Sequence, residues 1–276
     1  MTTSSPASSN ASRHDLWTIA AIAIVAYCSA NLLHEGLGHG GACLLVGCKP
    51  EMLNAIFFDF DEKLVADMPL RFIEAGGTLV NLVAGCIGLA VLRSGWPRAA
   101  TGSYFLWLLT ALNLLTAFGY FMFSGIGGIG DWAMVLRGWE PAVAYRLFLA
   151  VFGAATYFVL APRLLMPHFA KFLNKDRDLG KQARTLMLLP YLVGGITFVI
   201  AGLFNPYGLK LVLISAAAAS FGGTSLLAWY PADKRCTPVG DADGTPFAIE
   251  RSVPWLVAAA LMLIFFIGIL GPGIKL

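Results

Sequence analysis

The stretch "LWTIAAIAIVAYCSANLLHEGLGHGG", residues 16–41, decides the fold of this chain. Its first part, residues 16–33, holds no charged side chain, and about 20 such residues cross a hydrocarbon core of roughly 30 Å as one helix. Its second part carries His34, Glu35 and His39. Ionisable groups inside a membrane are costly and by default mark a function. The stretch therefore predicts a membrane helix that ends in a functional site.

The composition of the whole chain is that of an integral membrane protein. Of its 276 residues, 58% are hydrophobic and 13% are charged, whereas a soluble domain is about 45–50% apolar and about 25% charged. Apolar runs recur along the chain, so we expect an all-α, multi-pass transmembrane helical bundle with about seven spans. The predicted spans are residues 16–33, 72–92, 104–123, 143–161, 186–204, 211–229 and 255–270.

The distribution of basic residues predicts the orientation of the bundle. Residues 163–184 contain the densest group of Lys and Arg, and the positive-inside rule places this connection in the cytoplasm. Alternation then places the N-terminus in the cytoplasm and residues 49–70 and 124–142 outside. We expect a cell-membrane protein surrounded by the lipid bilayer. Its net charge of +3 is too small to indicate a nucleic-acid partner.

Two polar segments flank the first span and its motif. Residues 1–15 form a Ser-rich tail that we expect to be disordered, and residues 16–276 form a single transmembrane domain. The segment "EMLNAIFFDFDEKLVADMP", residues 51–69, is too charged to span a membrane and has short, strand-like apolar stretches. It predicts either a hairpin or re-entrant flap at the outer surface, or an ordinary surface loop.

The spacing of the two histidines predicts an irregular helix. His34 and His39 are five residues apart, which in a regular helix turns about 500° and leaves the two rings about 140° apart. Gly36 and Gly38 weaken the helix by about 1 kcal/mol each and permit a π-bulge, which absorbs one residue in a wide turn. A bulge would bring both imidazoles to one metal ion and place Glu35 to take a proton from the attacking water. The alternative is a pair of buried histidines that only form hydrogen bonds within the bundle.

Other polar residues and thiols lie within or beside the apolar runs. Asn81 and Asn113 are expected to form hydrogen bonds between helices. The cysteines form no CxxC pair and are expected to be small buried hydrophobes, although Cys43, four residues after His39, is an alternative thiolate ligand. The five cysteines are Cys28, Cys43, Cys48, Cys86 and Cys236.

Three stretches carry a resemblance to known metallopeptidases. The heptapeptide "HEGLGHG", residues 34–40, resembles the HEXXGH variant of the zinc-peptidase motif found in the dipeptidyl peptidase III family. Its membrane setting resembles the site-2 protease family of intramembrane zinc metalloproteases. "EAGGTLVNLVAG", residues 74–85, is similar to the glycine-containing helix of that family, and "GIGGIGDWAMVL", residues 125–136, is similar to its Asp-containing segment.

The resemblance implies a ligand set for Zn2+ and a catalytic core of about residues 16–136. By this resemblance His34, His39 and Asp131 are the metal ligands and Glu35 is the general base. Glu74 is the alternative third ligand, because glutamate has that role in HEXXGH peptidases. We favour Asp131, which follows a glycine-rich bend, and expect the other carboxylate to orient a ligand histidine. The histidine spacing of five and the Trp after the aspartate differ from the site-2 pattern.

These features predict an intramembrane zinc metalloprotease with its active site towards the outer leaflet. The expected substrates are membrane proteins or membrane-associated peptides, added as a strand to residues 51–69. Two alternatives remain open. One is a membrane zinc hydrolase of a lipid or other amphiphile. The other is a non-catalytic metal-binding or transport protein, in which Glu35 is a ligand or proton relay.

Overall fold

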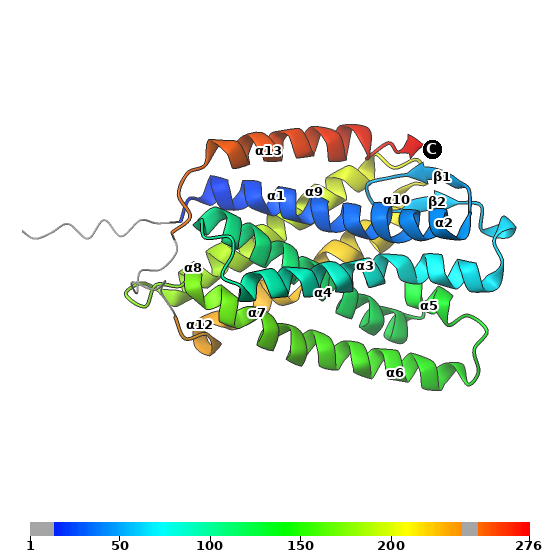
Figure 1. Ribbon diagram of the computed structural model, residues 1–276, viewed down its shortest axis with the longest axis horizontal. Coiled ribbons are helices and arrows are strands. Elements are labelled where there is room, and N and C mark those ends of the chain that lie inside the picture. Colours follow the sequence, from blue (N-terminus) through cyan, green and yellow to red (C-terminus); the bar gives the residue numbers. More distant parts are fainter. Residues whose placement is uncertain (1–13, 239–247) are drawn as a thin grey trace, which may run out of the picture.

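Long helices that run side by side make up most of the molecule (Figure 1). The structure is a computed structural model that describes residues 14–238 and 248–276, so the predicted disordered tail lies almost entirely outside the described residues. Within these ranges, five helices are long and apolar enough to cross a membrane, fewer than the seven predicted spans, and the mostly helical fold agrees with the predicted all-α class. They are Leu16–Val46, Asp67–Arg93, Ala100–Gly127, Ala142–Phe172 and Leu179–Gly202.

The first membrane helix changes its winding along its length. It begins as α1 (Leu16–Leu32), continues as the π-helix η1 (Leu33–Gly40) and ends as α2 (Gly41–Val46). The π-helix covers the histidine motif, so the predicted bulge is confirmed. The helix stops at Gly47, whose φ of 75° lies in the left-handed region that favours glycine.

A small antiparallel sheet lies against the π-helix, beside α2 in Figure 1. Its hairpin consists of β1 (Pro50–Leu53) and β2 (Phe58–Phe60), and a short 3-10 helix, η2 (Glu62–Leu64), follows. The predicted hairpin in residues 51–69 is therefore confirmed. A third strand, β3 (Ile274–Lys275), pairs with β1 and gives the strand order β2-β1-β3.

The next two membrane helices carry the rest of the site. They are α3 (Asp67–Arg93) and α4 (Ala100–Gly127), and both are longer than the predicted spans. After α4 the chain turns at once into the short helix α5 (Asp131–Val135), which packs against both α3 and α4.

The fourth and fifth membrane helices also extend beyond the predicted ends. The fourth continues past Ala161 because Leu165, Met166 and Phe169 bury one of its faces. Its segments are α6 (Ala142–Ala155), η3 (Thr156–Leu160), α7 (Ala161–Phe169) and η4 (Ala170–Phe172). The fifth is composed of α8 (Leu179–Ala183), η5 (Arg184–Leu188) and α9 (Leu189–Leu203).

The two C-terminal apolar runs are shorter helices. The predicted sixth span is interrupted at Gly223, where a Cβ would lie 2.4 Å from the Ala219 carbonyl oxygen. The predicted seventh span is a helix with two segments, the first of 11 residues and the second of 6 residues. This helix packs along α1. The segments are α10 (Leu209–Leu211), η6 (Val212–Gly222), α11 (Leu226–Trp229), α12 (Ala232–Arg235), α13 (Val253–Leu263) and η7 (Ile264–Ile269).

The largest buried side chains cluster where α4 begins and α7 ends. Tyr104 stacks on Trp107 with ring centroids 5.9 Å apart, and Trp107 also packs on Phe169. The indole N–H of Trp107 donates to the Leu165 carbonyl at 3.1 Å, so the polar atom of this large ring is satisfied. This aromatic core holds the bundle together at the end remote from the histidine motif.

We expect the packing of α6 on α4 to depend on glycine at position 153. A Cβ there would lie 2.3 Å from the Met122 backbone nitrogen, so Gly153→Ala should lower the free energy of unfolding by about 1–3 kcal/mol. Gly268→Ala is the matched control, because no atom lies within 4 Å of the added methyl group. Thermal unfolding of the purified protein should show a lower Tm for the first variant alone. Equal effects of the two variants would contradict this packing.

Candidate metal centre

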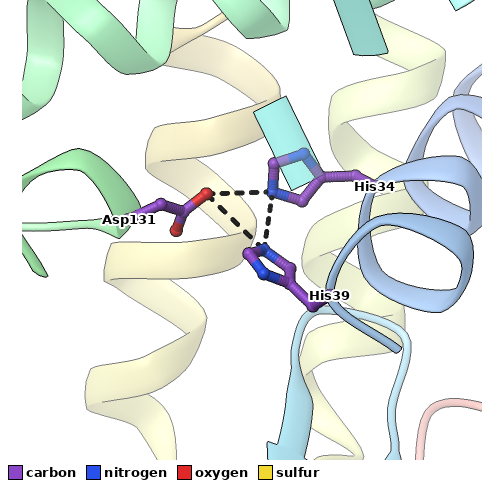
Figure 2. A group of neighbouring side chains, drawn as sticks. All are labelled: His34, His39 and Asp131. Carbon is purple, nitrogen blue, oxygen red and sulfur yellow. Dashed lines mark hydrogen bonds and ion pairs between the residues drawn. The ribbon is translucent and has the colours of Figure 1, made fainter. Parts of the chain in front are cut away.

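The π-helix places both histidine rings on the same side of the first membrane helix. His34 Nε2 and His39 Nε2 are 3.3 Å apart, and the two rings are nearly perpendicular, at 82° (Figure 2). Both side chains are buried. The wide turn thus removes the angular separation of about 140° that a regular helix would impose on this spacing.

Close contact between glycine backbones lets α3 approach the π-helix. A Cβ on Gly38 would lie 2.5 Å from the Gly77 Cα, and a Cβ on Gly76 would lie 2.5 Å from the Gly38 carbonyl oxygen. A Cβ on Gly77 would lie 2.6 Å from both His34 Nε2 and His39 Nε2. The absence of a side chain at Gly77 therefore forms the hollow in which the two Nε2 atoms meet.

Asp131 enters this hollow from the other side. Its Oδ2 atom lies 3.3 Å from His34 Nε2 and 3.5 Å from His39 Nε2 (Figure 2). The chain reaches this position because Gly128 and Gly130, with φ of 65° and 83°, turn it sharply between α4 and α5. Of the described residues, His34, His39 and Asp131 form the one group of three that can hold a metal ion.

Hydrogen bonds fix which nitrogen of each imidazole is free. His34 Nδ1 lies 2.5 Å from Asn81 Oδ1, and His39 Nδ1 lies 2.8 Å from the Ile73 carbonyl oxygen. Both of these oxygens are acceptors, so each Nδ1 carries the proton and each neutral ring presents a lone pair on Nε2. This arrangement is typical of metal-bound histidines.

The orientation of the Asn81 amide follows from a chain of hydrogen bonds. Asn81 Nδ2 donates to Asn113 Oδ1 at 2.7 Å, and Asn113 Nδ2 donates to the Leu109 carbonyl at 2.8 Å. The Asn81 oxygen is consequently the atom that faces His34. The predicted hydrogen bonding between the helices that carry Asn81 and Asn113 is confirmed, and it also orients a ring of the candidate site.

The donor set and its spacing fit a tetrahedrally bound metal ion. Zinc lies at about 2.0–2.2 Å from His nitrogen and carboxylate oxygen, and tetrahedral geometry then separates the donor atoms by about 3.3–3.5 Å. The three observed separations are 3.3, 3.3 and 3.5 Å. Because all three atoms are acceptors, a cation between them would turn mutual repulsion into attraction.

A neighbouring arginine supports the position of Asp131 in the site. Arg71 of α3 donates to the Val135 carbonyl and, at 2.5 Å, to the Arg137 carbonyl. Arg71 thereby ties α3 to the end of the short helix on which Asp131 is the first residue.

Glu35 lies beside the ligands and borders a small internal cavity. Its side chain is buried, and the backbone of Phe58 in β2 lies next to its carboxylate. His34, Glu35 and Tyr120 line the cavity, and the Tyr120 ring lies 4.9 Å from the His34 ring. The cavity volume is about 30 Å³, which is enough for about two water molecules. Water can therefore stand next to the predicted general base.

Two sequence predictions about this region are wrong. Glu74 is half-buried near the site, but the acceptors that orient the histidines are the Asn81 side chain and the Ile73 carbonyl. Cys43 is neither a ligand nor a simple buried hydrophobe, because it forms a disulfide with Cys48 across the turn at the end of α2. The other three cysteines are free, with Cys28 and Cys236 buried and Cys86 exposed.

Sequence reasoning missed three contributions to the site. The Ile73 carbonyl is a main-chain atom and has no sequence signal. Tyr120 lies within an apolar span and looks like an ordinary core aromatic. Arg71 had a usable signal, since a lone arginine at the start of a membrane helix needs partners for its charge.

Comparison with known proteins adds no family to this description. No protein-family model matches the chain, and neither a curated protein nor a solved structure is significantly similar to it. The chain is thus a mostly helical protein with five helices long and apolar enough to cross a membrane, and with a largely buried His2Asp group that could hold a metal ion.

We expect a methyl group at position 77 to abolish metal binding. The Cβ of Gly77→Ala would occupy the space between the two Nε2 atoms, so purified protein should lose most of its bound zinc, measured by atomic emission. Gly36→Ala is a matched control within the motif, because its Cβ would meet only Leu53 at an ordinary 3.9 Å. Full zinc content in Gly77→Ala protein would show that the ion is bound elsewhere.

We also expect the affinity for zinc to depend on Asn81. Asn81→Leu removes the acceptor for His34 Nδ1, and loss of such a partner weakens metal binding by about 10–100-fold. Competition titration with a chelator measures the Kd. Asn113→Leu interrupts the same chain of hydrogen bonds one step further away and should have a smaller effect. Equal losses for the two variants would indicate a general loss of packing.

Proposed function

We propose that this chain is an intramembrane zinc metalloprotease that hydrolyses peptide bonds of membrane-associated polypeptides. The observation that carries the proposal is the convergence of His34, His39 and Asp131 at tetrahedral spacing. Glu35 lies next to them and faces a cavity with room for water. The resemblance of the motif and of the Asp-containing segment to site-2 proteases supports the choice of a peptide bond.

The residues have separate roles in the proposed reaction. His34, His39 and Asp131 would hold the zinc ion, which would supply a Lewis acid that activates water and polarises the scissile carbonyl. Glu35 takes the proton of the attacking water and delivers it to the departing nitrogen, because a carboxylate can act first as base and then as acid. Asn81 and the Ile73 carbonyl hold both imidazoles in the tautomer that the site requires.

The sheet offers a way to present an extended substrate. β2 is an edge strand in the order β2-β1-β3, and its first residue, Phe58, lies beside Gly40 of the motif and next to Glu35. A polypeptide that pairs with this edge would be held in an extended conformation near the general base. Helical substrates would have to unwind locally before they could bind in this way.

The proposed orientation places the site at the outer side of a cell membrane. The Cys43–Cys48 disulfide lies at the site end of the bundle, and disulfides persist in oxidising compartments. The basic connection between the fourth and fifth helices lies at the other end, as the positive-inside rule requires of the cytoplasmic face. The proposal has seven crossings, with the five long helices completed by the α10–η6–α11 segment and by α13 with η7.

The proposed protease activity can be tested with membrane peptides. Purified protein loaded with zinc is incubated in lipid nanodiscs with a mixture of synthetic single-span peptides, and mass spectrometry detects new termini. Release of fatty acid from the same nanodiscs is measured in parallel. Cleavage of lipids without peptides would make the protein an amphiphile hydrolase, and zinc binding without any hydrolysis would make it a metal-binding or transport protein.

We expect Glu35→Gln to separate catalysis from metal binding. The change removes the base and leaves the three proposed ligands in place, so the rate should fall by about 10²–10⁴-fold while zinc remains bound. Glu74→Gln is the matched control, and it should retain zinc and most of the activity. Loss of zinc from the Glu35 variant would make Glu35 a ligand, and loss of zinc from the Glu74 variant would give Glu74 the place assigned to Asp131.

A further inference from the structure

The helices α7 and α12 lie away from the sheet, towards the other end of the bundle (Figure 1). A second cavity lies between α7 and the segment that contains α12. Its volume is about 400 Å³ and it opens to the surface. The walls combine two guanidinium groups, those of Arg163 and Arg235, with the hydroxyl of Thr237 and the apolar side chains of Met166 and Pro167. None of these residues takes part in the metal centre.

The two arginines have no anionic partner among the described residues. In residues 14–238 and 248–276, the Lys and Arg side chains that form ion pairs are Lys181 and Arg251. The Arg235 guanidinium lies 5.7 Å from the centroid of the Tyr230 ring, a contact that stabilises the cation and leaves its N–H groups available. Two guanidinium groups facing one cavity without a carboxylate repel each other, so the cavity favours an anion.

The depth of this cavity corresponds to the headgroup level of a membrane. Trp229, which is 55% exposed, and Tyr230 lie together at the end of α11, as aromatic residues do at the membrane interface. Arg184, Lys234 and Asp233 line a further cavity of about 280 Å³ that shares Tyr230 as a wall. Basic side chains thus outnumber the one acidic side chain around the interfacial aromatic pair, and Met166 and Pro167 give the cavity between α7 and α12 an apolar wall.

We propose that the cavity between α7 and α12 binds the phosphate headgroup of an anionic phospholipid. Arg163 and Arg235 donate to the phosphate oxygens, because the planar guanidinium group matches phosphate with paired hydrogen bonds. Thr237 donates a further hydrogen bond, and the glycerol and first methylene groups of the lipid lie against Met166 and Pro167. Basic pockets between membrane helices are a recurrent form of lipid recognition. The site is independent of the metal centre and of the proposed protease activity.

The test compares lipid binding by two variants with the same loss of charge. In Arg163→Gln/Arg235→Gln both guanidinium groups of the cavity are removed. In Arg98→Gln/Lys175→Gln two basic residues at the same end are removed, outside the cavity. Native mass spectrometry and Tm are measured with phosphatidylglycerol or phosphatidylcholine as the added lipid. Phosphatidylglycerol should stabilise the wild-type protein and the control, and the cavity variant should bind it about tenfold more weakly.

Further measurements distinguish the lipid from a free anion. Inorganic phosphate and glycerol phosphate, added at equal concentration, should stabilise the wild-type protein less than phosphatidylglycerol does. Equal stabilisation by free phosphate would overturn the lipid assignment. An equal loss of affinity for phosphatidylglycerol in both double variants would show that the lipid is attracted by the overall positive charge of this end and would overturn the cavity as its site. If the double variant does not fold, Arg235→Lys replaces it, since lysine keeps the charge without the paired donors. Unchanged lipid affinity in that variant would overturn the proposal.

Discussion

Two imidazole nitrogens and one carboxylate oxygen point at a common centre, and three such acceptors repel one another unless a cation lies between them. The rest of the site follows from this constraint. Each histidine must present Nε2, so each Nδ1 has an oxygen acceptor in the surrounding helices. The rings must share one side of the helix, so the motif is π-helical. The carboxylate must come from a separate segment, so a glycine turn directs Asp131 into the gap.

α3 builds the site without supplying a ligand. Gly77 provides the hollow, Ile73 and Asn81 orient the rings, and Arg71 holds the segment that carries Asp131. Ile73, Gly77 and Asn81 recur at intervals of four because residues four apart share a helix face, while Arg71 precedes them near the start of the helix. A rigid helix that fixes ligands from its two neighbours is an effective support, since small displacements of donor atoms weaken metal binding.

Much of this arrangement could be predicted from the sequence because it follows from local geometry. The five-residue spacing requires extra winding, and Gly36 and Gly38 permit it, so the π-helix was predictable. A short acidic side chain after a glycine-rich bend was a good candidate for the third position. The role predicted for Glu74 was wrong because the main-chain carbonyl of Ile73, one residue earlier, orients His39. Main-chain atoms carry no sequence signal. The disulfide and β3 depend on chain reversals that bring short segments together, which spacing alone does not reveal.

The sheet that covers the motif is joined on both sides. β2 contacts the π-helix, while β1 pairs with β3. The hairpin turn also donates two hydrogen bonds to the bundle, from Asn54 Nδ2 to the Gly271 carbonyl and from Ala55 N to the Leu270 carbonyl. Both carbonyls follow directly after η7. Lifting the cover would therefore pull on the last helix, which packs along α1, the helix that leads into the motif. The sheet beside the motif and the helices that frame the site are thus joined by hydrogen bonds, so a displacement of the C-terminal helix would also displace the sheet next to Glu35.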